Sequence, residues 1–220
     1  MNAKDISLAG IKLKIMDYGK SGTGKTTFAC TFPTPYIFDW DRGMLSQRGK
    51  DVEYETCTDY TRFLSNLNKV TKDDVHETIV IDSVTILEKA MMQHILLLNN
   101  RTEPTIHEWG RLVDGMVQLL IQLTKIDKHV VVVAHEQMVQ DELTQAVEIL
   151  PLIVGKKLPG QIPLWFDEVY RMEMGKDTAG NPCSIAHTVG TQKFCAKSRL
   201  GVLEPKVQNL TYTGIMSKVK

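Results

Sequence analysis

Short apolar runs recur in the first 135 residues and alternate with longer stretches in which apolar side chains return every three or four positions. The short runs predict buried strands, which lie at residues 15–16, 36–38, 78–81 and 130–134. The longer stretches predict amphipathic helices, which begin near residue 25 and cover about 60–70, 84–98 and 109–126. Because strands alternate with helices, we expect an α/β fold with a mainly parallel twisted sheet and helices on both faces.

The pattern changes after residue 135. Periodicity is weak over residues 137–163, which contain several Gly, Lys and Pro residues and predict a long loop that binds a partner. Alternating residues at 169–174 and 184–189, separated by a turn at 175–182, predict a β-hairpin extension. No break in composition marks a second domain. We therefore expect one domain over residues 1–220, with a core at 10–174 and the hairpin and a basic segment at 175–220.

Charge and cysteine content narrow the choice of function. The 26 Lys and Arg residues balance the 26 Asp and Glu residues, so any basic surface must be local. Residues 190–220 hold six basic residues and one acidic residue, and this segment is the most basic in the chain. The four cysteines form no C-x-x-C pair, which excludes zinc-ribbon and thioredoxin-like proteins. Without a signal peptide or a membrane-spanning run, we expect a cytoplasmic protein with reduced thiols.

One glycine-rich motif carries the clearest chemistry. It follows the first predicted strand and fits the pattern G-x-x-x-x-G-K-[ST] of the phosphate-binding loop. The predicted nucleotide-binding residues are Gly19, Lys20, Ser21, Gly22, Thr23, Gly24, Lys25, Thr26 and Thr27. Backbone N–H groups of such a loop surround a diphosphate, Lys25 reaches the β- and γ-phosphates, and the Thr26 hydroxyl binds Mg²⁺. The alternative is a Gly/Ser/Thr-rich surface loop, but the flanking strand and helix favour the motif.

Polar side chains stand at the ends of three further predicted strands, where open α/β sheets place their chemistry. Asp82 ends a buried run, and together with the phosphate-binding loop it predicts a Walker B carboxylate that holds Mg²⁺. Asp39 and Asp41 follow the second strand, where a solvated turn is the alternative. His135 follows the strand at 130–134 and is placed to sense the γ-phosphate, although it could also serve only as a hydrogen-bonded strand end.

The order of these motifs resembles the RecA/RadA-like recombinase core. More closely, the chain resembles the phage-encoded RecA-fold nucleotide-binding proteins of the Sak single-strand annealing group. The segments that carry the closer resemblance are 19–27, 38–41, 81–83, 133–136, 155–159, 166–169 and 196–199. The Walker motifs are common to all P-loop proteins, whereas the segments after residue 155 narrow the group.

The resemblance implies roles for individual residues. Asp41, with Asp39 as second choice, would orient the attacking water. Because the family more often has Glu there, the shorter Asp41 predicts slow hydrolysis. His135 would be the switch that links the γ-phosphate to a DNA-contacting loop at 137–159, and a second loop would lie at 99–107.

Two pairs of basic residues acquire roles in the same way. Lys156 and Lys157 are the DNA-binding candidates of the longer loop. Lys197 and Arg199 would act on the γ-phosphate of a neighbouring subunit, the alternative being a solvated surface pair. Asp141, Glu142 and Glu148 offset the loop lysines, so the basic segment at 190–220 is the other candidate for contact with DNA.

The sequence thus predicts an ATPase that uses ATP and Mg²⁺. Its resemblance implies phage recombination by annealing or strand exchange on single-stranded DNA, in the cytoplasm of the bacterial host. It also implies self-association into a ring or filament and a phage single-strand binding protein as partner. The alternative is an assembly or loading factor without direct DNA binding. A small-molecule kinase is disfavoured, because its lid would need arginines and none occurs between Val133 and Phe166.

Overall fold

A nine-stranded sheet forms the centre of the part of the chain that the computed structural model describes, residues 8, 10–140 and 145–219. Its strands are β1 (Lys14–Gly19), β2 (Pro35–Asp39), β3 (Glu53–Thr56), β4 (Thr78–Asp82), β5 (His129–Ala134), β8 (Glu168–Lys176), β9 (Pro182–His187), β10 (Lys197–Ser198) and β11 (Lys206–Gln208). The order across the sheet is β11-β9-β8-β1-β5-β4-β2-β3, and β10 pairs with β8. All pairings from β8 to β3 are parallel, which confirms the predicted sheet.

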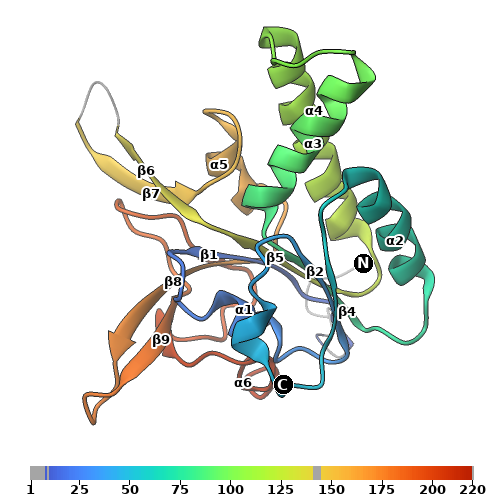
Figure 1. Ribbon diagram of the computed structural model, residues 1–220. Coiled ribbons are helices and arrows are strands. Elements are labelled where there is room, and N and C mark those ends of the chain that lie inside the picture. The colour runs from blue at the N-terminus through green and yellow to red at the C-terminus, as the bar shows by residue number, and fades with distance from the viewer. Residues whose placement is uncertain (1–7, 9, 141–144, 220) are drawn as a thin grey trace, which may run out of the picture.

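Helices cover both faces of this sheet, as predicted (Figure 1). One face carries α2 (Tyr60–Lys72), α3 (Val84–Leu98) and α4 (Ile106–Lys125), which bury Phe63, Leu87 and Met116. The other face carries the short helices α1 (Lys25–Ala29) and α6 (Tyr212–Met216), which bury Phe28 and Ile215. Further short helical segments are η2 (Met44–Gln47), α5 (Leu158–Gln161) and η3 (Ile162–Leu164).

The alternation of side chains in the central strands explains why they are apolar throughout. In β1, Ile15 packs into the core beneath α1, whereas Met16 and Tyr18 pack into the core beneath α3 and α4. A strand covered on both faces buries every residue, so it lacks the polar alternation of a half-exposed strand. Its parallel neighbours place their carboxyl ends at one edge, and the phosphate-binding loop leaves β1 at that edge.

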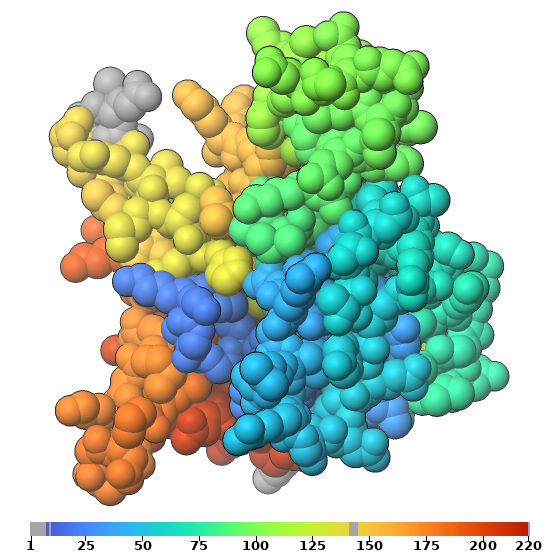
Figure 2. Space-filling model, in the orientation of Figure 1, coloured from blue at the N-terminus to red at the C-terminus, as the bar shows by residue number. Residues whose placement is uncertain are grey.

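Residues 137–163 differ from the sequence-based expectation of a long loop. They contribute to an antiparallel pair, β6 (Glu136–Gln140) and β7 (Val147–Pro151), and then to α5 and η3. Residues 141–144, which include Asp141 and Glu142, lie outside the described residues, as does Lys220. The expectation was wrong because both strands are largely exposed: Met138 is 65% exposed, so burial imposes no clear period on the sequence. Figure 2 shows this hairpin, in yellow, projecting from the body of the molecule.

The hairpin predicted at 169–189 is confirmed as β8 and β9, and β8 also pairs with β1, so the hairpin continues the central sheet. Besides the elements of residues 137–163, the described elements that were not predicted from the sequence are η2, β3, β10, β11 and α6. Among the described residues, none of the helices combines the length and the apolar character needed to span a bilayer.

Candidate nucleotide-binding site

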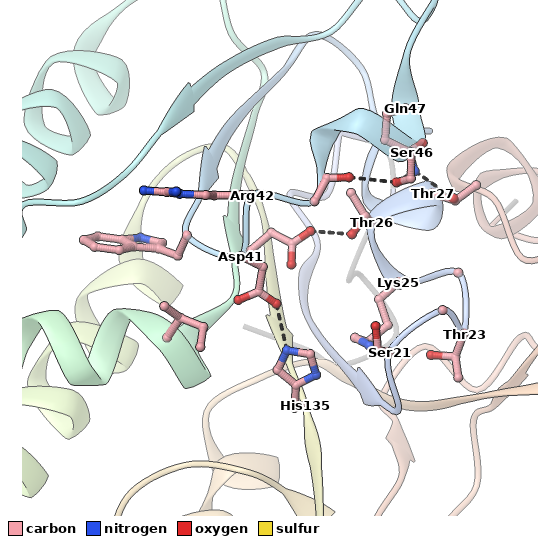
Figure 3. A pocket seen from close by; sticks show the side chains of 16 residues that line it. Ser21, Thr23, Lys25, Thr26, Thr27, Asp41, Arg42, Ser46, Gln47 and His135 are labelled. Carbon is pink, nitrogen blue, oxygen red and sulfur yellow. Dashed lines mark hydrogen bonds and ion pairs between the residues drawn. The ribbon is translucent and has the colours of Figure 1, made fainter.

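A cleft of about 720 Å³ opens at the carboxyl ends of β1, β4 and β5. The predicted residues Lys25, Thr26, Asp41, Asp82 and His135 all line it, although they come from different parts of the sequence. In Figure 3, the loop side chains Ser21, Thr23 and Lys25 lie on one side, and Asp41 and His135 lie on the other. The topology thus gathers these residues at the edge where open α/β sheets bind their ligands.

Glycines fix the path of the phosphate-binding loop. A Cβ on Gly19 would lie 2.2 Å from the Met172 carbonyl oxygen of β8, so only glycine fits where the loop leaves β1. Gly22 and Gly24 have φ of +79° and +91°, which is left-handed backbone that other residues avoid. Ser184 of β9 donates a hydrogen bond to the Thr23 carbonyl at 2.8 Å and braces the loop from outside. The loop is therefore held by its own glycines and by the β8–β9 hairpin.

Lys25 places its ammonium group inside this loop. Its Nζ donates hydrogen bonds to the carbonyl oxygens of Gly19, at 3.0 Å, and Lys20, at 2.7 Å. Burial lowers the pKa of Lys25, and the carboxylates of Asp17, Asp82 and Asp41 oppose that change. A buried cation surrounded by loop backbone is the arrangement that neutralises a bound polyphosphate.

Thr26 and Asp82 form the candidate magnesium site. The Thr26 hydroxyl donates a hydrogen bond to Asp82 Oδ2 at 2.5 Å, so the two oxygen atoms lie side by side in the wall of the cleft. Burial raises the pKa of Asp82 to about 6, against the lowering effect of the Thr26 hydrogen bond. The described residues contain no group of three or more His, Cys, Asp or Glu side chains able to hold a metal ion. The pair fits Mg²⁺, which binds through one or two protein oxygens and takes its other ligands from phosphate and water.

Asp41 is fixed by two hydrogen bonds. Its Oδ2 lies 2.7 Å from His135 Nε2, and its Oδ1 accepts a hydrogen bond from the Ser83 hydroxyl at 2.8 Å. Burial acts to raise the pKa of Asp41, but the hydrogen bonds from His135 and Ser83 prevail and lower it. Asp39, the second choice, instead accepts a hydrogen bond from the Gly43 amide at 2.9 Å and does not line the cleft. Asp41 is thus the carboxylate that faces the site.

His135 joins the cleft to the β6–β7 hairpin. Its amide donates a hydrogen bond to the Thr85 hydroxyl at 3.0 Å, and its carbonyl accepts one from Leu152 at 2.8 Å. Its side chain contacts Asp41, while the next residue begins β6. The residue that carries the imidazole is therefore the direct neighbour in sequence of the first strand of the hairpin.

Two residues of this region were missed by sequence reasoning. Asp17 of β1 is fully buried, and neither of its carboxyl oxygens has a hydrogen-bond partner among the described residues. Burial raises its pKa to about 8, and Lys25 opposes that rise. The available signal was a single carboxylate within an apolar run. Gln47 of η2 lines the cleft and donates to the Thr27 hydroxyl at 3.1 Å, and no sequence motif marks it.

The remaining predicted residues lie away from this cleft. Lys197 donates hydrogen bonds to the carbonyl oxygens of Pro163 and Phe166, and Arg199 pairs with Asp167 at 2.9 Å. β10 pairs with the first residues of β8, at the strand end opposite the phosphate-binding loop, so neither side chain serves the cleft of its own subunit. Their action on a neighbouring subunit stays a prediction.

Lys156 and Lys157 are also absent from the cleft. Both are exposed on the segment that precedes α5. Their predicted contact with DNA stays a prediction as well.

Comparison with protein-family models gives a match over most of the chain. A family model described as an AAA domain matches residues 11–200. The matched segment covers most of the 220 residues and includes the phosphate-binding loop, Asp41, Asp82 and His135. A search of curated proteins found no match.

Proposed function

The chain belongs to the AAA domain family of P-loop ATPases, and from that premise we propose that it is a slow, RecA-like recombination ATPase acting on single-stranded DNA. The observation that carries the proposal is the position of Asp41. It is held by His135 and Ser83 in the same cleft as the Thr26–Asp82 pair and Lys25. Carboxylate, candidate metal ligands and phosphate-binding lysine thus share one site.

Each residue then has a separate task. Lys25 and the loop amides hold the phosphates. Thr26 and Asp82 would hold Mg²⁺, which would supply stabilisation of negative charge on the phosphates. Asp41 orients the attacking water, and its lowered pKa keeps it ionised and able to accept a hydrogen bond from that water. His135 senses the γ-phosphate through its contact with Asp41.

The DNA half of the proposal is supported by the position of the β6–β7 hairpin. His135 leads directly into β6, so the hairpin is attached to the residue beside Asp41. A RecA-like protein would use such a segment to couple nucleotide state to DNA contact. Assembly into a ring or filament would bring Lys197 and Arg199 of one subunit to the cleft of the next, where cations stabilise phosphoryl transfer.

ATP hydrolysis by the purified protein tests this proposal. We expect hydrolysis that requires Mg²⁺, is abolished in Lys25→Ala and is strongly slowed in Asp41→Asn. Single-stranded DNA should raise the rate, which separates the recombinase from an assembly or loading factor. If Asp41→Asn hydrolyses ATP at the wild-type rate, the assignment of Asp41 is wrong. If DNA has no effect at low salt, the loading factor is the better description.

A further inference from the structure

A second cavity, of about 610 Å³, lies outside the nucleotide-binding cleft. It is formed by the end of β9, the segment 189–194 that follows it, and the start of β11. Its lining includes His187, Gln192, Lys193, Phe194 and Lys206. None of these residues lines the cleft described above. The volume falls within the range of cavities that accept small organic molecules.

An aromatic ring forms part of the wall and is held in a fixed orientation. The Phe194 ring meets the His187 ring in an edge-on contact, with 4.8 Å between centroids. The Arg171 guanidinium carbon lies 5.3 Å from the Phe194 centroid. His187 is itself fixed, because its Nε2 lies 2.7 Å from Glu173 Oε1. A ring held in this way gives a nucleobase a stacking surface at little cost in conformational entropy.

Two unpaired cations stand at the same cavity. Lys193 and Lys206 are exposed, and neither ammonium group has an ion pair or hydrogen bond within the part of the chain that the structure describes. The described lining residues include no Asp or Glu, while Gln192 adds an uncharged hydrogen-bonding group. Free lysines beside an aromatic ring suit a ligand that carries both a base and a phosphate. The charge also agrees with the basic character of residues 190–220.

The cavity wall is bonded to the β6–β7 hairpin. The Ile149 amide of β7 donates a hydrogen bond to the Lys193 carbonyl at 2.7 Å, next to Phe194. Arg171, which lies over the Phe194 ring, also pairs with Glu136 at 3.2 Å. Glu136 is the residue after His135. Figure 1 shows the chain after β9 running beneath β6 and β7. A ligand at Phe194 would therefore contact a segment that is bonded to β7 and that lies beside Arg171, the partner of Glu136 in β6.

We propose that this cavity binds one nucleotide unit of a single-stranded nucleic acid, with the base against Phe194 and the phosphates at Lys193 and Lys206. The proposal rests on the proposed action on single-stranded DNA and assigns that action to a surface. It places the contact with DNA at this cavity instead of at Lys156 and Lys157. A ligand in the cavity would contact Phe194, over which Arg171 lies. Arg171 in turn pairs with Glu136, the residue next to His135.

Binding of a fluorescent oligothymidylate at low salt, measured by anisotropy, tests the site. Phe194→Leu keeps an apolar side chain but removes the ring, and we expect about 5- to 160-fold weaker binding, the range for loss of one stacked base. Phe194→Trp should restore binding. Lys193→Ala with Lys206→Ala should reduce the slope of log affinity against log salt by about 1.4, because each phosphate contact to a single strand contributes about 0.7.

Two control pairs of lysines show whether binding depends on where the positive charges lie or only on how many there are. Lys69→Ala with Lys72→Ala removes the same charge from exposed positions in the last turn of α2 and should bind like wild type. Lys156→Ala with Lys157→Ala tests the competing location and should also keep the wild-type salt slope. Circular dichroism verifies that each variant is folded.

The outcomes are distinct. If wild type binds and the Phe194→Leu and Lys193/Lys206 variants bind equally well, the site is wrong and the proposed function stands. If the wild-type protein does not bind the oligonucleotide, the cavity site and the proposed action on single-stranded DNA are both wrong. No variant is needed to establish that result. Thymidine monophosphate that displaces the oligonucleotide at equal affinity would show a mononucleotide site instead of a strand site and would overturn the proposal.

Discussion

Replacement of Asp17 by Asn should stabilise the protein in a way that depends on pH. The carboxyl group is fully buried beneath the phosphate-binding loop and has no hydrogen-bond partner among the described residues. Burial raises its pKa from 3.8 to about 8, and the partial compensation comes from Lys25. Between these two pH values the folded protein holds a proton that the unfolded chain releases. The free energy of unfolding therefore falls as pH rises through this window and levels off above about pH 8.

The size of the effect follows from the pKa values. Each pH unit within the window costs about 1.4 kcal/mol. At pH 7, roughly three units above the unfolded value, the carboxyl group costs about 4 kcal/mol relative to a neutral side chain, as an upper estimate. An unpartnered buried amide has its own cost of about 1–3 kcal/mol, which does not change with pH. The protonated carboxyl group of the wild type is also buried without a partner and carries a similar cost. The net gain at pH 7 is therefore at most about 4 kcal/mol, and the pH dependence is the sharper quantity.

Urea-induced unfolding of wild type and Asp17→Asn at pH 5 and pH 7 measures this quantity. The stability difference between the two proteins should grow by about 3 kcal/mol between these pH values, in favour of the variant. Asp51→Asn is the matched control, because it removes a carboxylate from an exposed position and should follow the wild-type profile. A difference between wild type and Asp17→Asn that stays constant from pH 5 to pH 7 would refute the reasoning.

Three further predictions concern the cleft. Asp82→Asn should raise the Mg²⁺ concentration for half-maximal hydrolysis by at least about tenfold, since it removes a ligand beside Thr26; an unchanged Mg²⁺ dependence would contradict the assignment. Gly19→Ala should cost about 1–3 kcal/mol in urea unfolding, because its Cβ would meet the Met172 carbonyl at 2.2 Å; wild-type stability would show that β8 can move away. Asp41→Asn should slow single-turnover hydrolysis by about 10²–10⁴-fold while ATP affinity measured by fluorescence changes little; a loss confined to affinity would make Asp41 a binding residue.

The parallel core could be predicted from the sequence because burial on both faces leaves a clear signal. β4 and β5 are fully buried and read as continuous apolar runs. β3 gave no such signal, since none of its residues is buried at the sheet edge: Glu53, Tyr54 and Thr56 are exposed, and Glu55 is half-buried. The β6–β7 hairpin was missed for the same reason. A local pattern therefore predicts elements in which burial imposes a period or a continuous apolar run, and it fails for strands that are largely exposed.

The same distinction holds for the candidate site. The phosphate-binding loop and Asp82 could be predicted because their chemistry requires fixed residue types at fixed spacing. The Asp41–His135 contact joins positions 94 residues apart, and only the order of strands brings them together. The Phe194 cavity could not be predicted, because it depends on how the segment after β9 packs against β7.

The most direct test of the account compares ATP hydrolysis with and without single-stranded DNA in wild type and in His135→Ala, at low salt with Mg²⁺. We expect a slow rate in wild type that rises when DNA is added, and loss of that rise in His135→Ala, because the histidine joins Asp41 to the hairpin. A wild-type rate that does not respond to DNA, or an equal response in both proteins, would contradict the central claim that nucleotide and DNA are coupled through this residue.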